Sequence, residues 1–157
     1  MTQVSPTLLE NLTFDELQSG QSASLQRTLT PEAVRDFARV SGDVNPAHLD
    51  PEYAAGTPFG TVIGHGMWSG ALISALLGTR FPGPGTIYLG QDLKFHRPVH
   101  IGDTVTVTLT VREKDERKKR VVLDAEVCNQ NGERVVSGVS TVLAPTVKVS
   151  RPAMALD

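Results

Sequence analysis

The sequence predicts an α+β protein in which an antiparallel sheet wraps around one central buried helix. Residues 65–79 are apolar on nearly every side of a helix, which is typical of a helix in a protein interior. Residues 104–111 alternate Thr with Val or Leu, the period of a strand with one covered face. Asn131-Gly132 is a strong hairpin signal between two further strand-like segments. One sheet packed on one helix is the simplest architecture that satisfies all three observations.

The first part of the chain is predicted to be a strand followed by an amphipathic helix. Residues 21–29 alternate moderately between polar and apolar side chains, which indicates the first strand. Thr30 and Pro31 then form a helix start, with Thr as N-cap and Pro in the first helical position. This helix is expected to end near Gly42. Its apolar face is formed by Val34, Phe37 and Ala38.

Two more helices are expected before the sheet resumes. The Asp-Pro-Glu sequence at residues 50–52 repeats the start signal and predicts a short helix that Gly56 terminates. The central helix at residues 65–79 follows it. Gly78 is its expected C-cap, and Arg80 lies near the negative end of its dipole.

The second half of the chain predicts a meander of strands. The strand-like segments are residues 86–95, 104–111, 121–127 and 134–143. The run from Arg112 to Arg120 mixes charges of both signs at a strand end, which indicates a solvated hairpin tip.

The length of 157 residues fits a single domain, residues 1–157, that can bury a core without disulfides or metal. We expect this core to extend over about residues 21–143. Residues 1–20 and 144–157 contain little that would pack, so they are expected to be loose ends.

Composition excludes several classes of protein. The chain is 39% hydrophobic and 20% charged with a net charge of −2, whereas nucleic-acid-binding proteins usually carry a basic excess. The single cysteine, Cys128, excludes an intrachain disulfide and favours a cytoplasmic location. Residues 1–20 lack the pattern of a signal peptide, and the apolar stretch at 67–77 is too short to span a bilayer. We therefore expect a soluble cytoplasmic protein with no nucleic-acid or membrane partner.

The strongest chemical signal is the pair formed by Asp43 and His48. They lie five positions apart and are separated by Asn45-Pro46, which disfavours helix at the Asn and bends the chain. A carboxylate and an imidazole that converge across such a loop can hold a water, take its proton and return a proton elsewhere. Asn45 would orient the loop or the water. Because an Asp and a His in a loop are often structural, the pair alone does not decide the function.

A second signal is the sequence Gly-His-Gly-Met at residues 64–67, where the central helix begins. Free backbone N–H groups point outward from the first turn of a helix, at its positive end. Gly66 has no side chain, so a ligand carbonyl can approach its amide, which would then act as an oxyanion hole. His65 is expected to orient the loop rather than to transfer protons. The alternative is that these glycines only permit close packing of helix against sheet.

A metal site is not expected, although Asp43 and four histidines are available as ligands. No pair has zinc-finger spacing or an i, i+4 arrangement on a credible helix. The histidines are His48, His65, His96 and His100.

Three segments together resemble the (R)-specific enoyl-CoA hydratases, the MaoC-like branch of the hot-dog fold. The specific one is the Gly-Asp-x-Asn-Pro-x-His motif at residues 42–48, and His-Gly-Met at 65–67 and Ile-Tyr-Leu-Gly-Gln at 87–91 follow in the same order. The resemblance covers about residues 28–142, and the predicted sheet and helix match the hot-dog fold. Ala47 departs from the pattern, since a branched aliphatic residue is more usual there. The chain also resembles the amino-terminal hydratase-like domain of some bifunctional proteins that carry a phosphate acyltransferase domain afterwards.

The resemblance implies reversible hydration of trans-2-enoyl-CoA to (R)-3-hydroxyacyl-CoA. Asp43 and His48 would be the catalytic pair, and the Gly66 amide would bind the thioester oxygen. Ser74 matches a serine that lines the family's acyl pocket or its hydrogen-bond network, although helix serines often bond to a backbone carbonyl instead. No cofactor is implied, because the CoA thioester is itself the electron sink. The family forms two-fold dimers, so acyl-CoA and a second copy of the chain are the expected partners.

Two other classes stay open from the sequence. A hot-dog thioesterase or an acyl-carrier-protein dehydratase usually takes a carboxylate from the central helix, and residues 65–80 contain none. A non-catalytic acyl-CoA-binding domain of a larger acyltransferase would bind the ligand without turnover.

Overall fold

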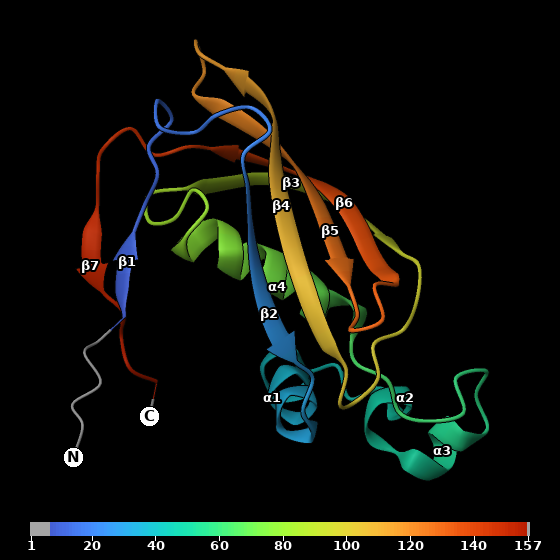
Figure 1. Cartoon of the computed structure of the whole chain (residues 1–157). Coiled ribbons are helices and arrows are strands. Elements are labelled where there is room, and N and C mark those ends of the chain that lie inside the picture. The colour runs from blue at the N-terminus through green and yellow to red at the C-terminus, as the bar shows by residue number, and fades with distance from the viewer. Residues whose placement is uncertain (1–6, 157) are drawn as a thin grey trace.

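The computed structural model describes residues 7–156 and shows an antiparallel sheet that curves around one long helix (Figure 1). The helix is α4 (Gly66–Thr79), and the order of the five strands across the sheet is β2-β4-β5-β6-β3. The strands are β2 (Ser22–Thr28), β3 (Ile87–Phe95), β4 (Thr104–Asp115), β5 (Arg120–Cys128) and β6 (Arg134–Leu143). This is the α+β architecture of the hot-dog fold, and it confirms the predicted fold class.

The turns of the meander follow the predicted signals. The charged run covers the end of β4, the turn at residues 116–119 and the start of β5, so the strand extends further into the run than predicted. Lys119 in this turn has a φ of 55°. Gly132 has a φ of 75° in the hairpin between β5 and β6, and its N–H donates to the carbonyl of Asn129. That left-handed backbone conformation explains the need for glycine in this turn.

Helix α1 (Pro31–Ser41) begins and ends where the sequence predicts. The Thr30 hydroxyl accepts the N–H of Ala33, and Gly42 closes the helix with a φ of 79°. Helix α3 (Pro51–Ala55) likewise ends at Gly56.

Two features of the helices differ from prediction. Residues Pro46–Leu49 form an additional single-turn helix, α2, because the Asn45 side chain accepts the N–H of Ala47 and caps it. The prediction of Gly78 as the C-cap of α4 is wrong. The helix continues through Thr79, and the cap is Arg80, whose N–H donates to the Leu76 carbonyl.

The core lies between α4 and the concave face of the sheet. On α4, the side chains that face the sheet are at most 1% exposed: Ile73, Leu76 and Leu77. On β4, every second residue is at most 2% exposed, namely Val105, Val107, Leu109 and Val111. Each such side chain contributes roughly 1.5–3 kcal/mol by burial, so this contact fixes the position of α4 on the sheet.

The opposite side of α4 is open in the single chain. Met67 is 55% exposed, and Ala71 and Ser74 are exposed on the same stripe of the helix. In residues 7–156 no helix is both long and apolar enough to cross a membrane.

The prediction of loose ends is wrong for the described residues. Strand β1 (Leu8–Glu10) pairs with β7 (Ser150–Pro152) in a small antiparallel sheet beside the main one (Figure 1). Phe14 and Leu17 are each 1% exposed and belong to the core. The buried Asn11 side chain also bonds to three backbone groups, those of Pro84, Val147 and Val149. Residues 1–6 and 157, also part of the predicted ends, lie outside the described residues.

Strand β6 depends on glycine at position 138, so we expect Gly138→Ala to destabilise the fold. A Cβ there would lie 1.9 Å from the backbone oxygen of Asp92 on β3, which cannot move without breaking the pairing of β3 with β6. Such overpacking costs roughly 1–3 kcal/mol or more, measurable as a shift of the urea midpoint. Gly78→Ala is the matched control, because a Cβ at Gly78 meets nothing within 4 Å. Equal stability of the two variants would contradict the explanation.

Candidate active site

A tightly bonded turn positions Asp43 between α1 and α2. The left-handed Gly42 reverses the chain at the end of α1, and the Asp43 N–H donates to the Ser41 hydroxyl. The Asn45 N–H donates to Oδ1 of Asp43 at 3.2 Å. Asn45 therefore acts on both sides of the turn, since its side chain also caps α2. The bond from Asn45 holds the carboxylate in place. The Asp43 side chain is still 51% exposed, so a ligand can reach it.

His48 lies on α2, and its tautomer follows from its hydrogen bond. Nδ1 is 2.7 Å from the backbone carbonyl of Ile63, which can only accept. Nδ1 must therefore carry a hydrogen, and in the neutral ring Nε2 has the free lone pair. His48 thus presents one nitrogen that can take a proton.

The carbonyl that fixes His48 is itself held from two sides. The Ile63 N–H donates to the Ala47 carbonyl at 3.2 Å, and Ile63 forms an isolated bridge with His100. The N–H of Gly64 donates to the Val99 carbonyl at 2.8 Å. The segment before α4 is thereby fastened both to α2 and to the loop after β3.

His65 contacts Asp43, His48 and Phe37, which come from three different segments. It is 4% exposed, and its ring centroid lies 4.0 Å from that of His48 and 4.9 Å from that of Phe37. Nε2 of His65 is 2.9 Å from the backbone carbonyl of Asp43 and 4.0 Å from its carboxylate. His65 thus contacts both members of the acid–imidazole pair, a geometry that suits the orienting role expected for it.

Gly66 is the first residue of α4, where backbone N–H groups have no partner within the helix. The N-cap residue, His65, makes no side-chain hydrogen bond that would occupy them. A Cβ at Gly66 would lie 2.9 Å from the ring of Phe95. A side chain at position 66 would therefore displace the Phe95 ring, which is 55% exposed. This contact fits the packing alternative and leaves the approach of a ligand to the amide untested. Gly66, His48 and Phe95 line one cavity of about 290 Å³.

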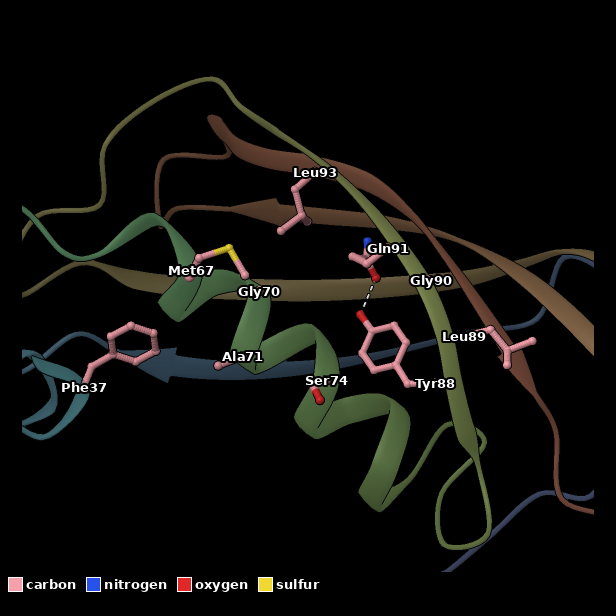
Figure 2. Close-up of a pocket in the computed structure, with 10 residues that line it drawn as sticks. All are labelled: Phe37, Met67, Gly70, Ala71, Ser74, Tyr88, Leu89, Gly90, Gln91 and Leu93. Carbon is pink, nitrogen blue, oxygen red and sulfur yellow. Dashed lines mark hydrogen bonds between the residues drawn. The ribbon is translucent and has the colours of Figure 1, made fainter. Parts of the chain in front are cut away.

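Ser74 lies apart from the other predicted residues. It lines a second hollow of about 510 Å³ between α4 and β3, shown in Figure 2. Phe37 lines the same hollow and packs on His65, so this groove, as we call it, extends to the Asp43–His48 loop. The residues that line it are Phe37, Met67, Gly70, Ala71, Ser74, Tyr88, Leu89, Gly90, Gln91 and Leu93.

Although no metal is expected, one cluster among residues 7–156 has the residue types and spacing to hold an ion. One ligand atom from each of Asp43, His48 and His65 lies within 4.8 Å of the others. One nitrogen of each ring already lies within hydrogen-bond distance of a backbone carbonyl, Nδ1 of His48 at Ile63 and Nε2 of His65 at Asp43. The absence of a metal stays a prediction.

Cys128 is not suited to nucleophilic catalysis. Desolvation, with a smaller contribution from a hydrogen bond to Glu126, raises the pKa of the thiol to about 11. The thiolate that would act as a nucleophile is therefore scarce at neutral pH.

The sequence missed several residues that build the site. The Ile63 carbonyl and the ring of Phe37 carry no motif, because a backbone acceptor and a packing ring are defined only by the fold. Tyr88 and Gln91 lie in the Ile-Tyr-Leu-Gly-Gln segment at 87–91, which was the available signal for them.

A curved sheet around one helix, with an Asp/His loop beside the helix N-terminus, defines this protein as a hot-dog enzyme. The sequence model of the MaoC like domain matches residues 14–131, and the chain belongs to that family.

The relatives agree in fold and in sequence. An (R)-specific enoyl-CoA hydratase of Rhodospirillum rubrum is 48% identical over 132 residues, which cover 84% of this chain and 91% of the relative. A 3-hydroxybutyryl-CoA dehydratase of Methylorubrum extorquens is 42% identical, with 92% of this chain and 91% of the relative covered. The unliganded structure of R-hydratase PhaJ1 from Pseudomonas aeruginosa is 47% identical with a TM-score of 0.92, covering 96% of this chain and 97% of that one. These relatives confirm the expectation of an enzyme of the (R)-specific enoyl-CoA hydratase group.

Proposed function

We propose that the chain catalyses the reversible addition of water to trans-2-enoyl-CoA, giving (R)-3-hydroxyacyl-CoA. The observation that carries the proposal is the pairing of a fixed, accessible Asp43 carboxylate with a His48 whose Nε2 is free. Both lie beside the N-terminal end of α4, where Gly66 lines a cavity with His48. The names of the relatives support the substrate class.

In this mechanism the Asp43–His48 pair acts on one water. The pair takes a proton from the water as its oxygen bonds to C3 of the enoyl group, and the C2–C3 π electrons move toward the thioester. The pair then returns a proton to C2, so one water is added in total. Asn45 holds Asp43 in place, and His65 holds both partners.

The Gly66 amide would stabilise the enolate that forms between these proton transfers. It sits at the positive end of α4, which favours negative charge on the thioester oxygen. No cofactor or metal takes part in this proposal, because the thioester carbonyl accepts the electrons.

The two hollows suggest how the substrate lies. The cavity at Gly66 would take the thioester and the adjoining pantetheine arm. The groove past Phe37, lined by Ser74, would take the acyl chain, since most of its lining is apolar. The cytoplasmic location expected from the sequence stays a prediction.

We expect Asp43→Asn and His48→Gln each to lower kcat by at least ~10²-fold, the scale of lost acid–base catalysis. Hydration of crotonyl-CoA, followed by the loss of enoyl absorbance, measures the effect. Asp36→Asn and His100→Gln are the matched controls, because Asp36 pairs with Arg39 on the surface and His100 pairs with Asp103. Near-wild-type turnover by either test variant would remove that residue from the mechanism. A wild-type protein that binds crotonyl-CoA without turnover would instead indicate a binding domain.

The product is expected to be the (R)-3-hydroxyacyl thioester, as the names of the relatives suggest. Which isomer forms depends on the face of the double bond that the water attacks. Coupling hydration to an (S)-specific 3-hydroxyacyl-CoA dehydrogenase and NAD tests this, and little NADH should appear. Rapid NADH formation would overturn the stereochemical assignment.

We also propose a homodimer, because one edge of the sheet is apolar and the other is polar. Edge strand β3 exposes Ile87 by 57%, Leu89 by 46% and Phe95 by 55% beside the open stripe of α4. Leu89 also lines the groove, so in the proposed dimer the acyl chain would lie at the interface. The other edge, β2, carries mainly Ser, Gln, Arg and Thr. An apolar, unpaired edge is normally covered by another chain.

Light scattering should therefore give about twice the chain mass of 16.9 kDa. Ile87→Lys should shift the protein toward monomers, since it places a charge in the proposed contact. Ser22→Lys, at an exposed position on β2 at the other edge of the sheet, should leave the dimer intact. A fully active wild-type species of single-chain mass would contradict the dimer.

A further inference from the structure

Strand β3 contains a bulge that changes which way its side chains point. Tyr88 pairs with Val142 of β6, but the next pair is Gly90 with Thr141, so Leu89 is an extra residue. Side chains three positions apart on a regular strand lie on opposite faces. The extra residue places Tyr88 and Gln91 on the same face, the concave one that carries Val142 and Ser140.

A hydrogen-bond network fixes the two side chains there. The Tyr88 hydroxyl donates to Oε1 of Gln91, and the hydroxyl of the fully buried Ser140 donates to the same oxygen at 2.5 Å. Nε2 of Gln91 donates to the backbone carbonyl of Asp92 at 2.8 Å. The Tyr88 hydroxyl is protonated at neutral pH and can donate its bond to Gln91, and burial raises its pKa further. The Tyr88 ring is thus held at its free end.

The ring lies in the groove between α4 and β3. Figure 2 shows it turned toward Gln91, with Ser74 on the helix opposite and Met67 and Phe37 at the other end of the groove. Phe37 packs on His65, so that end is the one near the Asp43–His48 loop. Met67 and Ser74 are seven positions apart, roughly 10 Å along the helix axis. Met67 and Leu93 approach each other over Gly70 in this groove, since an atom of each lies within 3.2 Å of a Cβ built on Gly70. An extended acyl chain that enters past Phe37 therefore meets Tyr88 after a short distance.

We propose that Tyr88, held by Gln91 and Ser140, is the stop that limits the length of the acyl chain. This rests on the function proposed above and names its substrate class as short-chain 2-enoyl thioesters. A longer chain must turn the Tyr88 ring away. This breaks the hydrogen bond from the Tyr88 hydroxyl to Gln91, so that only Ser140 still donates to Oε1 of Gln91. Misfit of even one methylene in such a pocket changes kcat/KM by roughly 10–200-fold, so the stop discriminates strongly.

The test is a series of trans-2-enoyl-CoA substrates of four, six, eight and ten carbons. For the wild type, kcat/KM should fall as the acyl chain becomes longer. Tyr88→Ala should raise the ratio of kcat/KM for decenoyl-CoA over crotonyl-CoA by at least ~10-fold. Tyr88→Phe keeps the ring but removes its anchor, and should raise the ratio by less.

Tyr53→Ala is the matched control, because Tyr53 is 53% exposed on α3 and lines neither the cavity nor the groove. Its ratio should equal that of the wild type. If Tyr88→Ala folds and hydrates crotonyl-CoA but its ratio of kcat/KM for decenoyl-CoA over crotonyl-CoA is unchanged, Tyr88 does not limit the chain length. If that variant does not fold, an unchanged ratio in Tyr88→Phe overturns the proposed stop. Lack of turnover by the wild type with all four substrates is a different outcome, which overturns the proposed function and with it this inference.

Discussion

The packing of α4 into the curve of the sheet is the contact on which the remaining features depend. The concave face is filled by Ile73, Leu76 and Leu77. Their burial fixes the rotation of α4 about its axis and its position along that axis, here called its height, relative to the sheet. The rotation leaves the Met67–Ser74 stripe facing outward beside β3, which creates the groove. The height places Gly66 against the end of β3 and beside the loop that carries Asp43 and His48. One apolar contact therefore determines where amide, acid, imidazole and groove meet.

Backbone carbonyls organise the polar part of the site. His48 is oriented by the Ile63 carbonyl and His65 by the Asp43 carbonyl, so neither imidazole relies on a charged partner for its orientation. Carbonyls only accept, which makes the protonated nitrogen of each ring a consequence of chain geometry. The Asp43 carboxylate is in turn held by an N–H group of its own turn. Neutral backbone groups therefore hold both side chains in place, which leaves the Asp43 carboxylate free to act on a water in the proposed reaction.

Local signals in the sequence were sufficient for the main elements and for the acid–imidazole pair. The caps at Thr30 and Asp50, the alternation along β4 and the Asp43–His48 motif each act within a few residues. Features that depend on distant partners could not be predicted. Three-residue strands such as β1 have too few positions to show a period, and the bulge at Leu89 exists only relative to β6. The contact of Phe95 with Gly66 likewise required the folded sheet.

The pairing of β1 with β7 has a consequence for the order of folding. Leu8 lies opposite Pro152, so this small sheet closes a loop of almost the whole chain. The entropy cost of closing a loop grows only slowly with its length, by roughly 0.6 kcal/mol per doubling. Three residue pairs, however, contribute little favourable free energy against that cost. The two strands therefore associate only after the main sheet and α4 have brought their ends together. With only three residue pairs, we expect this small sheet to open at a lower free energy than the main sheet, so its amide exchange would report on completion of the fold.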